Sequence, residues 1–281
     1  MPLKVVPTRD FDQQACYEFL ASDTLDYEHL DWLSAQERLF DSFTFVLLDG
    51  SEIKSMLSFS ADVPKITWIS FFAALRDGNH PSYFASLYAQ GIQYLKSYMV
   101  EFAFLLDLRP WMTIMAESQG FTLQDQVISF ALSPSVVPTP HLTPEITIRS
   151  MQPTDLDAVL LLDQLSFPPQ WQLGLRGLRK LQANDGLHSV LFHKDRLVAY
   201  AMQSTYGAFA HLDRVAVLPT FQSQGYGKTL ITNQIQTLMK SGVLKFTVNT
   251  QGSNLPSQAL YLGLGYTKTG IPVPVLSHRI R

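Results

Sequence analysis

A proline-rich segment near the middle of the chain divides it into two halves of nearly equal length. Positions 134–145 read PSVVPTPHLTPE, with four prolines in twelve residues. Proline has no backbone N–H and its ring clashes with the preceding helical turn, so this segment fits neither a helix nor a central strand. We therefore expect an extended linker at 134–145, with one domain at 1–133 and another at 146–281.

The two halves also carry matching residues at a constant spacing. Asp10 is matched by Asp155, and the glycine–aromatic pair at Gly120 is matched by the pair at Gly265, in each case 145 positions later. A spacing that is kept from one end of a half to the other indicates a tandem duplication rather than a short repeat. We expect one fold in each half.

Composition sets the broad class of protein. Hydrophobic residues make up 46% of the chain and charged residues 16%, which is enough apolar material for packed cores. Cys16 is the only cysteine, so an intramolecular disulfide and a cysteine-based zinc site are excluded, and we expect no metal. The N-terminus lacks the apolar stretch of a secretory signal, and the apolar runs at 68–75 and 100–106 are too short to span a bilayer. These features predict a cytoplasmic protein with no membrane partner.

Charge is distributed unevenly between the halves. Up to Pro140 there are 8 Lys and Arg against 17 Asp and Glu, and from His141 onward there are 13 against 7. A basic half beside an acidic half favours an anionic ligand for the second half. No cluster of lysine and arginine is dense enough to indicate nucleic acid.

The second half has a readable order of elements, β-α-α-β-β-β-α-β-α-β-β. Alternation and apolar periodicity predict strands and helices, interrupted by the loop Ser166–Gln172. The expected strands are 146–149, 189–193, 197–203, 212–218, 244–250, 266–269 and 273–278, and the expected helices are 154–162, 172–181, 225–241 and 257–264. This order is typical of an α/β domain built around a mixed sheet.

The most informative stretch is 214–230, RVAVLPTFQSQGYGKTL, in which a strand is followed by a short loop and a helix. The first N–H groups of a helix have no partner inside the helix, and the helix dipole places partial positive charge there. Gly225 and Gly227 remove side chains at that point, so a pyrophosphate can approach the backbone closely.

Two better-known phosphate loops do not fit this stretch. A Walker A loop needs a glycine five positions before Gly227, where Gln222 stands. A dinucleotide fingerprint needs its third glycine at Leu230.

The spacing Gln222-x-x-Gly225-x-Gly227, directly after a strand that bears Val215-Ala216-Val217, resembles the GNAT superfamily of acyl-CoA-dependent N-acetyltransferases. A second match follows downstream, in Asn254, Tyr261 and the pair Gly265-Tyr266. The resemblance covers about 125 to 135 residues of the second half, and together with the duplication it implies an α/β (α+β) protein of two tandem GNAT-like domains. Each domain would be a mixed, mostly antiparallel sheet flanked by helices.

The resemblance implies direct transfer of an acetyl group from acetyl-CoA to an amine acceptor that the sequence does not identify. Residues of the strand and loop would hold acetyl-CoA, joined by one asparagine and one tyrosine from the downstream match. These residues are Val215, Ala216, Val217, Gln222, Ser223, Gln224, Gly225, Tyr226, Gly227, Lys228, Thr229, Asn254 and Tyr261.

Tyr261 would also protonate the departing thiolate as general acid. Asp213 and His211 are candidates for the general base, with a structural salt bridge as the alternative for Asp213. Core packing is the alternative for Tyr261, and helix capping the alternative for Asn254. The loop Ser166–Gln172 would border the acceptor.

The first half repeats the element order but lacks a Gly-x-Gly loop after its strand at 68–75. We interpret it as a degenerate GNAT-like domain, with an unrelated α/β domain as the alternative. For the whole chain, a non-catalytic acyl-CoA sensor or scaffold is the alternative function.

Overall fold

The computed structural model describes residues 3–30 and 32–280. The chain forms two compact units, one made of residues 1–124 and 273–281, the other of residues 125–272. The predicted domain borders at 133 and 146 both fall inside the second of these units. The predicted and observed borders differ because most of β7, the last strand of the first half, lies in the second unit, and residues 273–279 of β13, the last strand of the second half, lie in the first.

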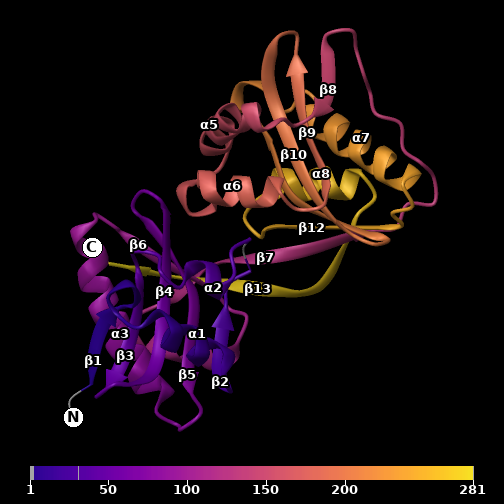
Figure 1. Ribbon diagram of the computed structural model, residues 1–281. Coiled ribbons are helices and arrows are strands. Elements are labelled where there is room, and N and C mark those ends of the chain that lie inside the picture. Colours follow the sequence, from indigo (N-terminus) through magenta and orange to yellow (C-terminus); the bar gives the residue numbers. More distant parts are fainter. Residues whose placement is uncertain (1–2, 31, 281) are drawn as a thin grey trace. The chain divides into compact units, whose positions relative to one another are not determined.

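Within the described residues, the first unit is built from strands β1 to β6, five helical segments and one end of strand β13 (Figure 1). Its elements are β1 (Lys4–Pro7), η1 (Thr8–Asp10), α1 (Gln13–Ala21), β2 (Thr24–Glu28), α2 (Ala35–Arg38), β3 (Thr44–Asp49), β4 (Glu52–Val63), β5 (Ile66–Leu75), α3 (His80–Ser97), β6 (Phe102–Leu106) and α4 (Pro110–Ser118). Its sheet runs β1-β3-β4-β5-β6-β13, and β2 pairs with β5 outside this order.

The second unit begins within strand β7 and ends within strand β13 (Figure 1). Its elements are β7 (Thr122–Leu132), β8 (Ile146–Ser150), η2 (Pro153–Asp155), α5 (Leu156–Ser166), η3 (Pro169–Trp171), α6 (Leu175–Gln182), β9 (Gly186–His193), β10 (Arg196–Tyr206), β11 (Phe209–Val217), η4 (Pro219–Phe221), α7 (Tyr226–Lys240), β12 (Lys245–Gln251), α8 (Leu255–Gly263) and β13 (Thr267–Arg279). Its sheet runs β8-β9-β10-β11-β12-β7.

The two sheets have the same topology, which confirms the predicted fold class. Each has one parallel pair, β5 with β6 in the first unit and β11 with β12 in the second, among antiparallel neighbours. The two sheets also carry a β-bulge at corresponding positions. A β-bulge at Ser70 interrupts the pairing of β4 with β5, and a bulge at Asp213 interrupts the pairing of β10 with β11. A shared bulge at the same place in the strand supports duplication of one ancestral domain.

The halves exchange their last strands. Residues 127–132 of β7 pair with β12 in the second unit, and residues 275–279 of β13 pair with β6 in the first. The two short strands predicted at 266–269 and 273–278 are therefore one strand. Gly270, Pro272 and Pro274 suggest a break in the strand. However, proline's fixed φ is compatible with extended backbone, and the strand continues through all three residues.

The exchanged strand contributes core residues to the first unit. Leu276 is buried in that unit's apolar cluster, whereas Ile271 on the same strand is 88% exposed. We expect Leu276→Ala to destabilise the first unit by about 2–5 kcal/mol, because it leaves a cavity in the core. Ile271→Ala, the matched control, should change stability by about 0.5 kcal/mol or less. Thermal and urea unfolding measure both, and equal effects of the two changes would contradict this role of β13.

Helix α7 positions the candidate site in the second unit. It packs on β9, β10 and β11, and its buried face carries Leu230, Ile231 and Ile235. The amide of Gln234 on the same helix donates to the Ala201 carbonyl of β10 at 3.0 Å. These contacts fix the N-terminus of α7 beside the end of β11.

Candidate active site

The end of strand β11 has an unpaired edge. Strand β12 pairs with β11 only from Phe209 to Leu212, while β10 pairs with it along its whole length. Within the described residues no strand pairs with the β12-facing side of residues 213–217. The bulge at Asp213 lies where the pairing stops, and a bulge increases the local twist of a strand. The two parallel strands therefore separate at this point.

Alternation identifies the backbone groups that face the open edge. The Leu218 N–H donates to the Val198 carbonyl at 2.8 Å, so Leu218, Ala216 and Arg214 direct their backbone groups toward β10. Val215 and Val217 then direct theirs to the open side. The Val217 carbonyl there accepts the Gln222 side chain at 3.1 Å and the Ser166 hydroxyl at 3.2 Å. The Val215 groups and the Val217 N–H are left for an extended ligand.

The loop after β11 leads into helix α7, whose first backbone N–H groups have no partner within the helix. Helix α7 begins at Tyr226, and its first main-chain bond runs from the Thr229 N–H to the Gly225 carbonyl at 2.9 Å. Among the described residues, the Gly227 and Lys228 N–H groups make no backbone hydrogen bond. These groups, with the exposed Lys228 side chain, form a positive site at the helix N-terminus.

The two glycines of the loop have different roles. Gly225 has φ +86°, a conformation that L side chains rarely adopt, and open space where a Cβ would lie. Gly227 has ordinary helical backbone, and a Cβ there would make normal contacts of 3.5 Å with Val217 and Leu260. Only Gly225 is required by the backbone itself.

Other predicted loop residues have partners within the protein. The Thr229 hydroxyl donates to the His141 carbonyl of the linker at 3.1 Å, and Thr229 is 5% exposed. The Tyr226 ring is buried against Phe221 and His193. A contact of these two with a bound phosphate would therefore come from their main chain.

The remaining loop residues, Ser223 and Gln224, are exposed. Ser223 has φ +61°, and the Gln224 amide donates to the Thr220 carbonyl at 3.3 Å. Their backbones complete the turn into α7. Asn254 accepts the Ser257 N–H at 3.2 Å as the cap of α8, so its side-chain oxygen has a structural role.

Tyr261 lies in the interior of the second unit. It is 3% exposed, and its ring packs between Phe130 and Tyr266. Burial raises the pKa of Tyr261 above the ordinary range of a phenol, while the nearby Arg214 charge and a hydrogen bond with Ser257 oppose that rise. The phenol is therefore protonated at neutral pH, as a general acid must be.

The two candidate bases lie on β11 before the open edge. The Asp213 carboxylate accepts the Ser204 N–H at 2.6 Å. Burial lowers the pKa of His211, so its ring is neutral near pH 7, and its Nδ1 lies 2.8 Å from the Thr247 hydroxyl. A carboxylate and a neutral imidazole can each accept a proton, so Asp213 and His211 both stay candidates for the general base.

The corresponding edge in the first unit is covered. Strand β2 pairs antiparallel with residues 71–75 of β5, and the His29 N–H donates to the Ser70 carbonyl at 2.8 Å. The first unit thus fills with its own backbone the edge that stays open in the second.

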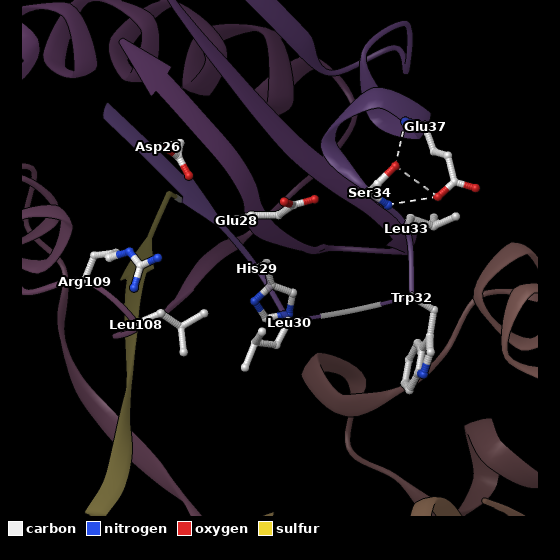
Figure 2. Close-up of a pocket in the computed structure, with 10 residues that line it drawn as sticks. All are labelled: Asp26, Glu28, His29, Leu30, Trp32, Leu33, Ser34, Glu37, Leu108 and Arg109. Atoms are coloured by element: carbon white, nitrogen blue, oxygen red, sulfur yellow. Dashed lines mark hydrogen bonds between the residues drawn. The ribbon is translucent and has the colours of Figure 1, made fainter. Parts of the chain in front are cut away.

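A cavity of about 590 Å³ lies beside β2 in the first unit (Figure 2). Two of its carboxylates have local partners: Glu28 accepts the Ala35 N–H at 2.6 Å and Glu37 accepts the Ser34 N–H at 2.9 Å. The cavity contains none of the predicted site residues, because the candidate donor site is an open strand edge rather than an enclosed hollow.

Sequence reasoning missed two residues near the open edge, Asp163 and Arg214, and included Ser166 only as the first residue of the loop expected to border the acceptor. Asp163 and Arg214 form a buried ion pair, and Ser166 bonds to Val217. The available signal was one aspartate directly after the apolar run of α5, a position that a helix normally buries.

Two absences hold for the described part of the chain. No group of three or more His, Cys, Asp or Glu side chains is arranged to hold a metal. No helix there is both long and apolar enough to cross a membrane.

Most of the second half of the chain matches a known protein family. Residues 156–266 match the model of the acetyltransferase (GNAT) family. The chain is 30% identical over 128 residues to the [ribosomal protein bS18]-alanine N-acetyltransferase of Escherichia coli K12, an alignment that spans 44% of this chain and 83% of that protein.

Solved structures show that the fold likeness extends over the whole chain. A tandem GNAT protein from the clavulanic acid biosynthesis pathway matches 100% of this chain and 99% of its own, with a TM-score of 0.61 and 11% identity. A GCN5-related N-acetyltransferase from Sphaerobacter thermophilus matches 100% of this chain and 96% of its own, with a TM-score of 0.58 and 13% identity. The chain belongs to the GNAT family of N-acetyltransferases.

Proposed function

We propose that the second unit transfers an acetyl group from acetyl-CoA to a primary amine, with the cofactor arm along β11 and the diphosphate at the N-terminus of α7. The observation that carries the proposal is the coincidence of an unpaired strand edge with free helical amides one short loop later. An extended, amide-bearing arm can pair with such an edge as an additional strand does. The helix N-terminus favours a diphosphate.

Each residue then has a defined task in the transfer. Bound acetyl-CoA supplies an acyl carbon that is activated as a thioester. The Val217 N–H faces the open edge and can donate to the oxygen that gains negative charge during attack. The amine nitrogen forms the new C–N bond, the C–S bond breaks, and Tyr261 gives its phenolic proton to the leaving thiolate. Asp213 or His211, directly or through water, takes the proton that the amine loses.

We propose the N-terminal amine of a polypeptide as the first acceptor to test. The support is the 30% identity to a [ribosomal protein bS18]-alanine N-acetyltransferase, because an alanine within a polypeptide has a free amine only at the N-terminus. The substrate of this chain need not be that protein, because the alignment covers only the second half.

A thiol-release assay tests the function. The purified protein is incubated with acetyl-CoA and a peptide that begins with alanine, and the product is analysed by mass spectrometry. We expect thiol release with one acetyl group on the α-amine. The same peptide with a blocked N-terminus is the control, and lysine peptides, polyamines and aminoglycosides extend the panel. Binding of acetyl-CoA without turnover of any acceptor would favour the sensor function, and failure to bind would contradict both.

We further propose that the first unit does not bind acetyl-CoA. Its β2 strand occupies the main-chain groups of β5 that correspond to the open edge of β11. Its chain after β5 also lacks the Gly-x-Gly spacing. The chain would therefore bind one acetyl-CoA.

A further inference from the structure

A buried ion pair lies behind the open edge of the second unit. Asp163, in the last turn of α5, is fully buried, and it accepts the Arg214 Nε at 2.8 Å and the Arg214 Nη2 at 3.0 Å. The Tyr200 hydroxyl of β10 also donates to this carboxylate. The Arg214 side chain is 10% exposed. The pair thus joins α5 to two strands of the sheet.

The same pair holds the segment after α5, residues 166–173. The Leu173 N–H donates to Asp163 Oδ1 at 2.9 Å, and Arg214 Nη2 donates to the Trp171 carbonyl. The Arg214 guanidinium lies 3.8 Å above the centre of the Phe167 ring. Because the Ser166 hydroxyl bonds to the Val217 carbonyl, the start of the segment is fixed to the open edge itself.

Stability alone does not explain this arrangement. The free energy required to remove two charges from water is about as large as the free energy gained from their attraction. Replacing such a pair by apolar residues is therefore often neutral or stabilising. The first unit provides an internal comparison. There the residue after the bulge is Phe71, which is 1% exposed, in the place that Arg214 takes in the second unit. The same fold therefore forms without the ion pair where β2 covers the edge.

We propose that Asp163 and Arg214 are positioning residues that hold residues 166–173 as a fixed wall on the acceptor side of the open edge. The proposal rests on the proposed function, in which the loop Ser166–Gln172 is expected to border the amine acceptor. The ion pair acts through the wall and does not touch the reacting atoms. Its loss should impair the use of the amine and spare the binding of acetyl-CoA.

Arg214→Lys is the test variant. Lysine keeps the positive charge beside Asp163 but lacks the planar fork that reaches both the carboxylate and the Trp171 carbonyl. Steady-state kinetics give KM for the amine, and calorimetry gives Kd for acetyl-CoA. We expect KM for the amine to rise about ten-fold or more, as misplacement near a reacting centre does. We expect Kd for acetyl-CoA to stay within about two-fold of the wild-type value, because the helix N-terminus is untouched.

Arg149→Lys is the matched control. Arg149 forms a bidentate pair with Asp155 in the same unit, at 2.7 and 2.8 Å, away from β11. It should leave both constants unchanged. Phe167→Leu is a second variant that keeps the ion pair and removes the ring beneath it, so the wall can be tested even if Arg214→Lys folds poorly. Hydrogen exchange of residues 166–173 should accelerate in both test variants and not in the control.

An unchanged KM for the amine in an active Arg214→Lys enzyme would overturn the proposal, and so would an equal loss of acetyl-CoA affinity. A wild-type protein that binds acetyl-CoA but acetylates no amine would contradict the proposed function as well. The two failures are distinguishable, because only the second appears before any residue is changed.

Discussion

Gly225→Glu should abolish acetyl-CoA binding, with at least about a hundred-fold loss of affinity, or roughly 2.7 kcal/mol. The carboxylate would stand at the N-terminus of α7 and compete with the diphosphate for the amides of Gly227 and Lys228. A negative charge at a helix N-terminus stabilises the helix, whereas the φ of +86° strains any L residue, so a control with the same charge and similar strain is needed to separate the ligand site from folding. Calorimetry with acetyl-CoA measures the effect.

Gly207→Glu is the matched control for this change. Gly207 lies in the same unit, has φ +61° and has open space at its Cβ, so the substitution adds similar backbone strain and the same charge. It lies in the turn between β10 and β11, at the other end of β11 from the loop. We expect it to bind acetyl-CoA as the wild type does. An acetyl-CoA affinity of Gly225→Glu within a few-fold of this control would contradict a diphosphate site at the N-terminus of α7.

Tyr261→Phe should lower kcat by about 10²- to 10⁴-fold, which is the usual contribution of a positioned acid or base. The change removes only the hydroxyl, so the packing of the ring against Phe130 and Tyr266 is kept. Because burial raises the pKa of Tyr261, the phenol is protonated below its folded-state pKa, and the wild-type rate should show no loss of this acid near neutral pH. Stopped-time assays at saturating acetyl-CoA measure kcat.

The control for Tyr261 lies five residues along the chain. Tyr266 is 1% exposed, its ring contacts Tyr261, and its hydroxyl has no hydrogen-bond partner within the described residues. Tyr266→Phe should therefore keep kcat and should not reduce stability, since it removes a buried polar group that is unsatisfied. Equal rates for the two variants would show that Tyr261 packs the core and does not supply the proton.

The strand–loop–helix unit could be predicted from the sequence because its signals are local. The glycine at 225 is needed by the backbone, the strand before it alternates, and the helix after it has an apolar face. The duplicated fold was also predictable, from the constant spacing of matching residues, and the shared sheet order confirms the fold class. The assignment of individual site residues stays a prediction.

The exchange of final strands could not be predicted from the sequence. Strands β7 and β13 follow equivalent helices and have similar sequence patterns. The local sequence therefore does not indicate which unit each strand joins. The closed edge of the first unit is equally hidden, since β2 and the segment 166–173 occupy equivalent places but adopt different conformations. Pairing between strands far apart in sequence depends on tertiary contacts, which the intrinsic β-propensity of individual residues does not include.

The partnership of Asp163 with Arg214 was hidden for a related reason. The two residues are 51 positions apart, and although the position of Asp163 after an apolar run suggests burial, nothing local indicates Arg214 as its partner. Only the fold brings the carboxylate, the guanidinium and residues 166–173 together.

A crystal structure of the chain soaked with acetyl-CoA would show whether acetyl-CoA binds along β11. We expect electron density for one molecule per chain, with its arm along Val215 and Val217 and its diphosphate on the amides from Gly225 to Lys228. Density along β5 of the first unit, or a vacant β11 edge at saturating acetyl-CoA, would contradict this expectation.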